Sequence, residues 1–521
     1  MITVGMDVFS TPFPVVEALG CALGGALVTL ICCYQTISLP RGPLSWIVDL
    51  YLRWKFLLCG APMMSEAYTK AKGGAFSVAG PDHDHVFISS KQHLKEIQRA
   101  KKDELSFFAA TRQMFQPAYT MLGHNWLDER GAEGIGYVKA VGTLLPERMR
   151  DIMPNMRVNI KRSFDREFSR VQSASDGSKA LPAPALIKKV MCDLNGYAFF
   201  GDELAQNEVF MKNVLEYNEL VVIAAEVLRI TPNFMKNWVG TFFKNQGGIQ
   251  ATVFTMINEV VERRLQEKAD REAGLISTPA PSDLVTWIID TAPKELNWTA
   301  RRVTYEVIAI WFGSVHALSA TTSYALYDLC LYKEYLSPLR DELSSAEFSK
   351  FMQTTQGLPL LDSFIKESTR HNPMEAMSGR RQALKDFYYS DGTKVAKGAW
   401  TVVPAKAILH DDQYFPDALR FSGFRFVSES AVVPEGVRKA LQPEGPSKLT
   451  DISPHYHSWG IGGVVCPGRF YASVAMKLVL EHIMVNYEVE LVDERAERAS
   501  IWRSYVLPAE RTQVRFTPRC A

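Results

Sequence analysis

The residue with the clearest chemical potential in this chain is Cys466, which lies in the run WGIGGVVCPGRF at residues 459–470. An isolated cysteine in apolar surroundings is commonly a small buried hydrophobe. Here the glycines among residues 460–468 allow the backbone to turn sharply and to approach a flat ligand closely. Pro467 suits the first position of a helix, and the apolar stretch 469–487 follows, so we expect the sulfur near a helix N-terminus. Unpaired N–H groups and the helix dipole there favour a thiolate, which could serve as the axial ligand of a haem iron.

Three charged residues earlier in the chain form a second pattern. Glu367 and Arg370 are three residues apart, so on a helix they share a face and can form an ion pair. An isolated pair of this kind is usually an exposed one that contributes little. Arg425, however, stands between Phe424 and Phe426, where a solvated charge fits poorly. We therefore expect a buried arginine that needs a carboxylate partner.

The run around Cys466 closely resembles the haem-binding loop of the cytochrome P-450 family, aromatic-x-x-Gly-x-x-x-Cys-x-Gly. Its ending CPGRFYA is similar to that of many fungal members. The resemblance implies that the cofactor is heme b and that Cys466 is the metal ligand. It also implies that Gly462 and Gly468 shape the loop and that Trp459, which stands where the family usually has phenylalanine, shields the thiolate.

Glu367, Arg370 and Arg425 match another family pattern in order and spacing. The resemblance implies that the glutamate and arginine of one helix lock onto the later arginine and pin the segment that carries the cysteine loop. It therefore implies the cytochrome P-450 fold. That fold is mainly α with small β-sheets, and it holds the haem between a long distal helix and the helix after the cysteine.

The resemblance leaves the contacts to the haem propionates incomplete. Val464, two residues before the cysteine, occupies a position where the family commonly has an arginine or histidine that reaches a propionate. We expect that charge to come from elsewhere. Arg381 matches a propionate-binding arginine of relatives, and Arg380 is the alternative. Lys139 could help, although a lone lysine is more simply a solvated side chain.

Apolar and small residues recur every three or four positions from about Thr299 to Leu331, which predicts a long helix with one inward face. Periodicity alone would also fit an ordinary core helix. In the family, such a helix crosses the distal face of the haem. Its pattern there is Ala/Gly-Gly-x-Asp/Glu-Thr, or Ala-x-x-His-Thr-Thr in many fungal enzymes.

Residues 313–318 align with this distal pattern, so His316 takes the acidic position and Ala317 replaces the usual threonine. In the family that threonine helps to deliver protons during oxygen activation. Alanine has no hydroxyl, so Ser314 or Thr321 on a neighbouring turn, ordered water or a substrate hydroxyl could replace it. A second register places Thr321 at the threonine position, but it shifts the downstream helix by about one turn.

Near the N-terminus, Val15–Tyr34 is an apolar run whose only charge is Glu17. A helix of that length spans about 30 Å, the thickness of the hydrocarbon core of a bilayer. A cleaved signal peptide would begin with a basic region, but residues 1–14 contain no Lys or Arg. We therefore expect a single-pass anchor within residues 1–40. A haem-thiolate catalytic domain, residues 41–521, would then lie on the cytosolic side of the endoplasmic reticulum membrane.

Composition excludes several other classes of protein. With a net charge of +1 and no basic block, the chain is not expected to bind nucleic acid. Its 8 cysteines show neither metal-ligand spacing nor a disulfide framework, which favours a reducing compartment. Periodicity and turn residues predict strands at 85–90 and 400–404, a strand that enters a tight turn at 387–393, and amphipathic helices at 207–228 and 254–272.

Together the sequence and the resemblance predict a membrane-anchored haem-thiolate monooxygenase. Its electrons would come from a separate NADPH-dependent cytochrome reductase, since no flavin or iron–sulfur module is evident. The expected pocket around Phe107, Phe108, Gly313 and residues 373–377 is mostly apolar, which favours a lipophilic small molecule. Family analogy favours a fungal secondary metabolite with a terpenoid, alkaloid or polyketide scaffold. Two alternatives remain: a haem-thiolate enzyme for desaturation, cyclisation, coupling or rearrangement, and a haem-binding sensor without catalysis.

Overall fold

The computed structural model describes residues 45–124, 126–127, 136–246, 248–293, 296, 298–428, 437 and 445–519. The apolar run expected to form the membrane anchor, and the boundary expected at residue 40, lie outside these residues. Within the described part of the chain, one helix, Ala300–Leu331, is long and apolar enough to cross a bilayer, and most of its apolar window is buried in the protein.

The described residues are mainly helical, as the sequence predicts. The α-helices are α2 Ser45–Ala71, α3 Lys91–Arg99, α4 Phe107–Phe115, α5 Pro117–Thr120, α6 Gly136–Lys139, α7 Leu145–Ser169, α8 Ala183–Ala205, α9 Glu208–Ile230, α10 Lys236–Lys244, α11 Ile249–Glu272, α12 Leu284–Thr291, α13 Ala300–Leu331, α14 Leu336–Leu343, α15 Ala346–Thr354, α16 Pro359–His371, α17 Ala405–Leu409 and α18 Arg469–Asn486. Short π- and 3₁₀-helical turns are η1 Ala140–Leu144, η3 Lys333–Tyr335 and η4 Gly462–Val464.

The strands are short and form small sheets. Their bounds are β1 Phe76–Ala79, β2 Asp84–Phe87, β3 Leu105–Ser106, β4 Lys179–Pro182, β5 Ser378–Ala383, β6 Phe387–Tyr388, β7 Lys394–Val395, β8 Trp400–Val403, β9 Tyr487–Leu491, β10 Ala499–Trp502, β11 Tyr505–Pro508 and β12 Gln513–Pro518. The largest sheet has five strands in the order β1-β2-β8-β5-β3, and the others are β4-β12-β9, β10-β11 and β6-β7. In the five-stranded sheet, β2 and β8 pair in parallel. The pairs β1–β2, β5–β8 and β3–β5 are antiparallel.

Most predicted elements are present, with shifted ends. The strand expected at 85–90 is β2, which ends earlier, and the segment at 387–393 consists of β6 and the turn that leads into β7. The helices expected at 207–228 and 254–272 are α9 and α11. Helix α10 between them was missed, because Pro232 and the glycines near it favour a loop in a reading of the sequence alone.

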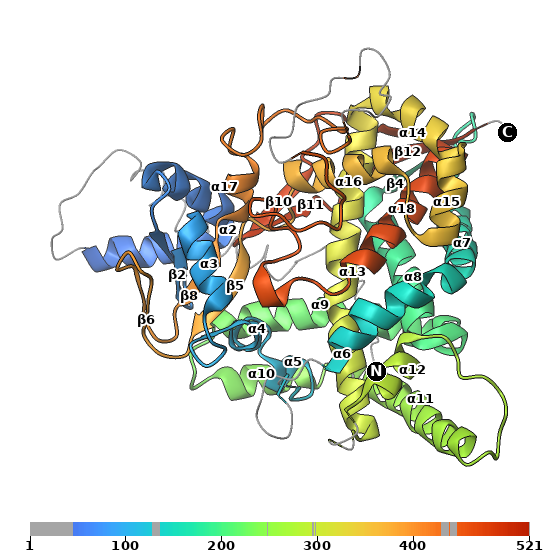
Figure 1. Ribbon diagram of the computed structural model, residues 1–521, viewed down its shortest axis with the longest axis horizontal. Helices are drawn as coiled ribbons and strands as arrows, with labels where there is room; N and C mark the ends of the chain where they lie inside the picture. Colours follow the sequence, from blue (N-terminus) through green and yellow to red (C-terminus); the bar gives the residue numbers. More distant parts are fainter. Residues whose placement is uncertain are drawn as a thin grey trace, which may run out of the picture.

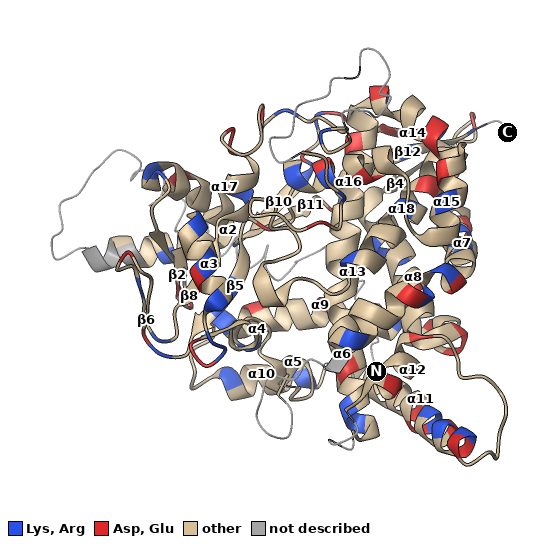
Figure 2. Ribbon diagram, in the orientation of Figure 1, with Lys and Arg blue, Asp and Glu red and all other residues tan. Residues whose placement is uncertain are grey.

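Helix α13 runs through the middle of the molecule, with the five-stranded sheet and helices α2, α3 and α17 on one side and helices α7, α14 and α15 on the other side (Figure 1). Thr299 caps its first turn by accepting a hydrogen bond from the Arg302 N–H. The indole Nε1 of Trp311 donates to the Val214 carbonyl at 3.1 Å, which ties α13 to α9. Helix α13 has no charged side chain between Glu306 and Asp328, and its central turns are correspondingly tan in Figure 2.

Candidate active site

The cysteine loop is closed by its own backbone. The N–H of Cys466 donates to the Trp459 carbonyl at 2.8 Å, which brings both ends of the loop together. Burial raises the pKa of the Cys466 thiol, while the N–H groups of Gly468 and Arg469 and the charge of Arg469 act in the opposite direction. The sulfur therefore already receives two backbone donors, which would stabilise a thiolate once a metal removes the proton.

The start of the following helix differs from the prediction. Helix α18 begins at Arg469 rather than at Pro467, and Gly468 is its N-cap residue. The guanidinium of Arg469 donates to the Cys466 carbonyl at 3.1 Å and to the Thr450 carbonyl at 3.2 Å. The N–H groups of Gly468 and Arg469 act in the expected direction, but burial is the largest influence and keeps the pKa of the free thiol raised.

The glycines keep the loop thin where side chains would collide. Gly460 and Gly462 have φ angles of +85° and +60°, which other residues rarely adopt. A Cβ atom on Gly462 would lie 2.8 Å from the Gln98 side chain, whereas one on Gly463 would meet nothing within 4 Å. The half-buried Trp459 is fixed by its indole Nε1, which donates to the Leu449 carbonyl at 2.6 Å. The loop thus has a rigid backbone and an open face.

Glu367, Arg370 and Arg425 form a completely buried ion cluster. The Glu367 carboxylate lies 2.7 Å from Arg370 Nε and 3.0 Å from Arg425 Nε, and all three side chains are fully inaccessible to solvent. Burial would raise the pKa of Glu367, but the two arginines outweigh it and hold that pKa below its usual value. Arg425 also donates to the Pro416 carbonyl at 2.7 Å, so the cluster fastens α16 to the segment that precedes the cysteine loop.

The two adjacent arginines of β5 have different surroundings. The guanidinium of Arg381 lies over the Phe107 ring and its Nη2 donates to the Ile461 carbonyl of the cysteine loop at 3.4 Å. Arg380 instead forms an ion pair with Glu375, which neutralises the one acidic residue of the expected substrate-facing turn. Of the two, Arg381 is the one attached to the cysteine loop.

The remaining expected charges are not at the loop. Val464 is half-buried and apolar, and Lys139 is exposed at the end of α6.

The sequence did not single out His457, whose buried ring nitrogens have no hydrogen-bond partner among the described residues. Its carbonyl accepts from the Ser378 hydroxyl at 2.8 Å, which places it beside the strand that carries Arg381. Burial lowers the pKa of His457 to about 4, so its ring is neutral at pH 7.

A strip of accessible positions interrupts the buried surface of α13. Gly313 is exposed and a Cβ atom there would meet nothing within 4 Å. Ile310, Ser314, Ala317 and Thr321 are half-buried, while Val315 and nearly all residues after Thr321 are buried. These positions recur at intervals of three or four residues, so they share one face of the helix. We take this accessible strip as the wall of the substrate chamber that the sequence predicts.

Ser314 is the strip residue with the most specific contacts. Its Oγ accepts a hydrogen bond from the Asn195 side chain at 3.1 Å and donates to the Trp311 carbonyl at 2.9 Å. The Tyr471 hydroxyl donates to Asn195 Oδ1 at 2.7 Å. The sequence did not identify Asn195 or Tyr471, because neither belongs to a recognised pattern. A buried polar residue within an apolar helical stretch is the only signal that Asn195 offered.

His316, which the expected alignment places at the acidic position of the family pattern, carries no charge at neutral pH. Burial lowers the pKa of His316 to about 4, and the positive charge of Lys188 adds to this effect. Its Nε2 is buried without a hydrogen-bond partner among the described residues. His316 therefore offers a neutral imidazole where an aspartate or glutamate would offer a negative charge.

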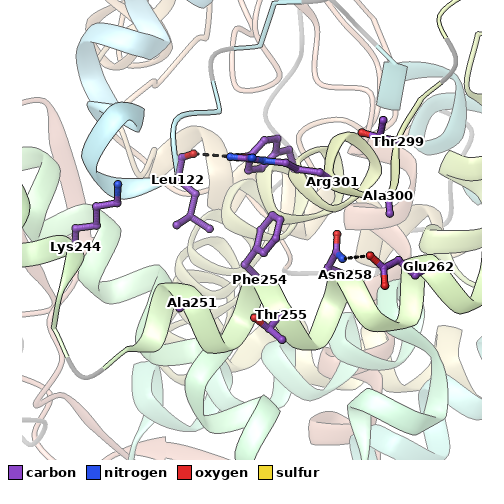
Figure 3. A pocket seen from close by; sticks show the side chains of 11 residues that line it. Leu122, Lys244, Ala251, Phe254, Thr255, Asn258, Glu262, Thr299, Ala300 and Arg301 are labelled. Carbon is purple, nitrogen blue, oxygen red and sulfur yellow. Dashed lines mark hydrogen bonds between the residues drawn. The ribbon is translucent and has the colours of Figure 1, made fainter.

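One cavity outlined by the described residues is separate from these positions. It has a volume of about 740 Å³ and lies between α11 and the first turns of α13 (Figure 3). It is lined by Leu122, Lys244, Ala251, Phe254, Thr255, Asn258, Glu262, Thr299, Ala300, Arg301 and Tyr305. None of the site residues expected from the sequence lines this cavity, so its size does not identify the reaction centre.

The residues at the cysteine loop fit a haem. The Cys466 thiol, which receives two backbone N–H groups, offers an axial ligand. The glycines leave the face of the loop open. Arg381 and the ring of His457, whose nitrogens have no hydrogen-bond partner among the described residues, offer polar groups for the propionates. The accessible strip of α13 lacks charge and leaves room at Gly313, which suits the opposite face of a flat, apolar macrocycle.

Comparisons with known proteins agree with this geometry. Residues 40–516 match the family model described as Cytochrome P-450. A similar protein is the cytochrome P-450 monooxygenase ptmQ of Penicillium ochrochloron, 26% identical over 486 residues, with 91% of this chain and 90% of the relative covered. Another is the cytochrome P-450 monooxygenase paxQ of Penicillium paxilli, 27% identical over 450 residues, with 83% of this chain and 82% of the relative covered.

Solved structures show the same fold. The retinoic acid-bound cyanobacterial CYP120A1 has a TM-score of 0.64 and 14% identity, with 89% of this chain and 97% of that chain covered. The cytochrome CYP102L1 has a TM-score of 0.65 and 16% identity, with 90% of this chain and 96% of that chain covered. The family match over most of the chain and this shared architecture lead to one conclusion: the chain belongs to the cytochrome P-450 family of haem-dependent oxidoreductases.

Proposed function

We propose that the protein is a haem-thiolate monooxygenase in which Cys466 ligates the iron of heme b. The observation that carries this proposal is the Cys466 sulfur, which receives backbone N–H groups from Gly468 and Arg469 in a loop with an open face. When bound, the haem supplies the oxidising chemistry, and the thiolate ligand favours cleavage of the O–O bond. The protein positions the haem and the substrate and keeps bulk water out.

The remaining predicted haem contacts have distinct roles in this proposal. Trp459 shields one side of the sulfur, and Arg381 pairs with a propionate in place of the side chain that is missing at Val464. The Glu367–Arg370–Arg425 cluster acts indirectly, because its buried ion pairs hold the segment before the cysteine loop against α16.

The chamber favours a lipophilic small molecule as substrate. Beside the α13 strip, the expected lining includes Phe107 and the turn at 373–377, whose one charge, Glu375, is neutralised by Arg380. Apolar walls with few polar groups select ligands mainly by shape. We propose a secondary-metabolite scaffold of terpenoid, alkaloid or polyketide type, which is consistent with fungal relatives such as ptmQ and paxQ. An NADPH-dependent cytochrome reductase would supply electrons at the endoplasmic reticulum membrane, where the expected N-terminal anchor would hold the enzyme.

The carbon monoxide difference spectrum of the reduced, membrane-expressed protein tests this proposal. We expect a red-shifted Soret band in wild type that is lost in Cys466→Ala. A matched control is Cys330→Ala, which removes a buried thiol of α13 and should retain the band. A folded wild type without any haem signal would contradict both the ligand assignment and the enzymatic function. A normal band without turnover by any reductase would favour a haem-binding sensor instead.

A second candidate function rests on Ala317. This residue lies on the accessible strip but has no hydroxyl, and His316 beside it is neutral. A site with limited proton delivery would favour desaturation, cyclisation, coupling or rearrangement over plain hydroxylation. Ala317→Thr distinguishes the two functions. More product of unchanged identity would speak against special chemistry, whereas a change from one product type to hydroxylation would support it.

A further inference from the structure

A chain of side-chain hydrogen bonds crosses the protein from the cysteine helix to the distal helix. Tyr471 lies on α18, Asn195 on α8 and Ser314 on α13. The Tyr471 hydroxyl donates to Asn195 Oδ1 at 2.7 Å, and Asn195 Nδ2 donates to Ser314 Oγ at 3.1 Å. The chain ends where the Ser314 hydroxyl donates to the Trp311 carbonyl at 2.9 Å. Two short polar bridges therefore connect the element after Cys466 with the strip that lines the chamber.

The direction of every bond follows from its neighbours. The Trp311 carbonyl can only accept, so the Ser314 hydroxyl donates its one proton there. Ser314 Oγ must then accept from Asn195 Nδ2, which turns Asn195 Oδ1 toward α18. Only a donating Tyr471 hydroxyl satisfies that oxygen. The network has one consistent arrangement of protons, so it fixes the rotamer of Ser314.

Burial makes this arrangement obligatory. Asn195 is completely buried and Tyr471 is 3% exposed. A buried amide or hydroxyl without a partner is costly, because it has lost its hydrogen bonds to water. The polar end of Asn195 thus has no alternative to Ser314 and Tyr471 in the described structure, and the three side chains are held as one unit.

Ser314 differs from the other hydroxyl residues of α13. Those that hydrogen-bond the carbonyl four residues earlier are buried within the helix packing: Thr304, Ser319, Thr322 and Ser323. Ser314 is half-buried on the chamber strip, between Gly313 and the turn of Ala317. Its proton is committed to a carbonyl, but its oxygen has a second lone pair. It can therefore act toward the chamber only as an acceptor.

We propose that Asn195 and Tyr471 are positioning residues that hold the Ser314 hydroxyl as the hydrogen-bond acceptor for water beside Ala317. This inference rests on the proposed haem-thiolate function and explains how a site without the usual threonine keeps an ordered polar group. Water bound at Ser314 would donate to its Oγ and keep its other proton free for the chamber. Ser314 anchors the water, while Asn195 and Tyr471 act only through Ser314.

The test is a double-mutant cycle in the full-length enzyme with its reductase. Two readouts are the Soret absorption of the resting ferric enzyme, which responds to water in the chamber, and the hydrogen peroxide released per NADPH consumed. We expect Ser314→Ala and Asn195→Ala each to change the resting spectrum and raise peroxide release about fivefold, the effect of one net hydrogen bond. The double variant should be no worse than Ser314→Ala alone, because Asn195 has no role without Ser314.

Two further variants separate positioning from simple packing. Ser314→Thr keeps the hydroxyl and should remain close to wild type. Ser319→Ala removes a buried hydroxyl of the same helix that donates to the Val315 carbonyl, and it should also behave like wild type. If Asn195→Ala loses its haem, Tyr471→Phe, which keeps the aromatic ring, replaces it in the same assay. We expect Tyr471→Phe to change the resting spectrum and the peroxide release in the same direction as Ser314→Ala, but by less.

Distinct results separate this inference from the proposed function. Loss of the red-shifted carbon monoxide band in wild type would contradict the haem-thiolate function itself. Variants that keep this band but show wild-type spectra and peroxide release would overturn the positioning role alone. Additive effects of Ser314→Ala and Asn195→Ala would also overturn it, since they would show that Asn195 acts independently of Ser314.

Discussion

Glu226 belongs to a ring of buried ion pairs that joins three distant segments. Its carboxylate lies 2.8 Å from Arg229 Nη1 and 2.5 Å from Arg503 Nε, and it accepts a hydrogen bond from Trp502 Nε1 at 2.9 Å. Both arginines also contact Asp82, each at 2.8 Å. The ring therefore connects the last turn of α9 with the β1–β2 turn and the β10–β11 turn. Burial would raise the pKa of Glu226, but Arg229 and Arg503 outweigh it and lower that pKa.

Replacing Glu226 by Gln should loosen this junction without changing its volume. The variant leaves two buried guanidinium groups opposite the single carboxylate of Asp82. Removing one partner of a buried ion pair costs about 3–5 kcal/mol. Because glutamine still accepts one hydrogen bond, we take the lower end, about 3 kcal/mol, which corresponds to roughly a 150-fold change in a local opening equilibrium.

Amide hydrogen exchange of the holoenzyme measures this opening directly. The Arg503 N–H donates to the Leu57 carbonyl at 2.6 Å, so it is protected only while the β10–β11 turn stays against α2. We expect its exchange, and that of the last turn of α9, to accelerate about 150-fold in Glu226→Gln. A matched control is Glu66→Gln. It breaks an ion pair with Lys70 whose side chains are 68% and 73% exposed, so it should change little.

Exchange data can refute this role of the ion-pair ring in two ways. If Glu226→Gln accelerates exchange less than about fivefold, the ring contributes no more than a surface pair does. The effect must also depend on pH with a definite sign. The pKa of Glu226 is lower in the folded state than in the unfolded state, so its stabilisation is present above the unfolded pKa and is lost as the pH falls through the folded pKa. Protection that increases on acidification would contradict this assignment.

Three further changes have definite expected outcomes. The Cβ atom added in Gly240→Ala would overlap the Tyr119 ring, so we expect about 1–3 kcal/mol of destabilisation and faster proteolysis at α10. An unchanged rate of cleavage would show that α5 and α10 separate freely. The Cβ atom added in Gly313→Ala would meet no atom within 4 Å, so the melting temperature should stay the same or rise. The affinity for bulky ligands should fall. A lower melting temperature would contradict an open chamber. Asp328 accepts a hydrogen bond from Asn372, and burial raises the pKa of Asp328 to about 8. Between roughly pH 4 and 8 the folded state therefore holds a proton that the unfolded state loses. As a result, stability falls by up to about 1.4 kcal/mol for each unit by which the pH rises in that range. Thermal unfolding of Asp328→Asn between pH 5 and 8 should lack this slope, and a slope equal to that of wild type would refute the raised pKa.

Local patterns were sufficient for the elements and for the spacing of the main site. The glycines around Cys466, the Glu367–Arg370 spacing and the periodicity of α13 are properties of short segments, and each has its counterpart in the structure. The prediction was less accurate where two local tendencies compete. Pro467 favours a helix start, but the helix begins two residues later at Arg469. Between α9 and α11, Pro232 and nearby glycines concealed helix α10, because packing rather than helix propensity stabilises so short an element.

Contacts between segments far apart in the chain could not be predicted from spacing. Asn195 and Ser314 are separated by 119 residues, and Asn195 and Tyr471 by 276. No local rule distinguishes Asn195 from a polar residue on a solvated helix face, since only the fold places α8 against both α13 and α18. The same holds for Glu226 and Arg503, 277 residues apart.

These long-range polar contacts bear on the proposed role of Ser314 beside Ala317. Ser314 is hydrogen-bonded to Asn195 of α8, and Asn195 is hydrogen-bonded to Tyr471 of α18. The proposed water anchor is then sensitive to the distance between α13 and α18, the helix that follows Cys466. A shift of α18 that lengthened the Tyr471–Asn195 bond would free the amide of Asn195 and with it the Ser314 rotamer. Substitutions at the α8–α18 contact, remote from any substrate, should therefore change peroxide release in proportion to their effect on the Ser314 hydrogen bond.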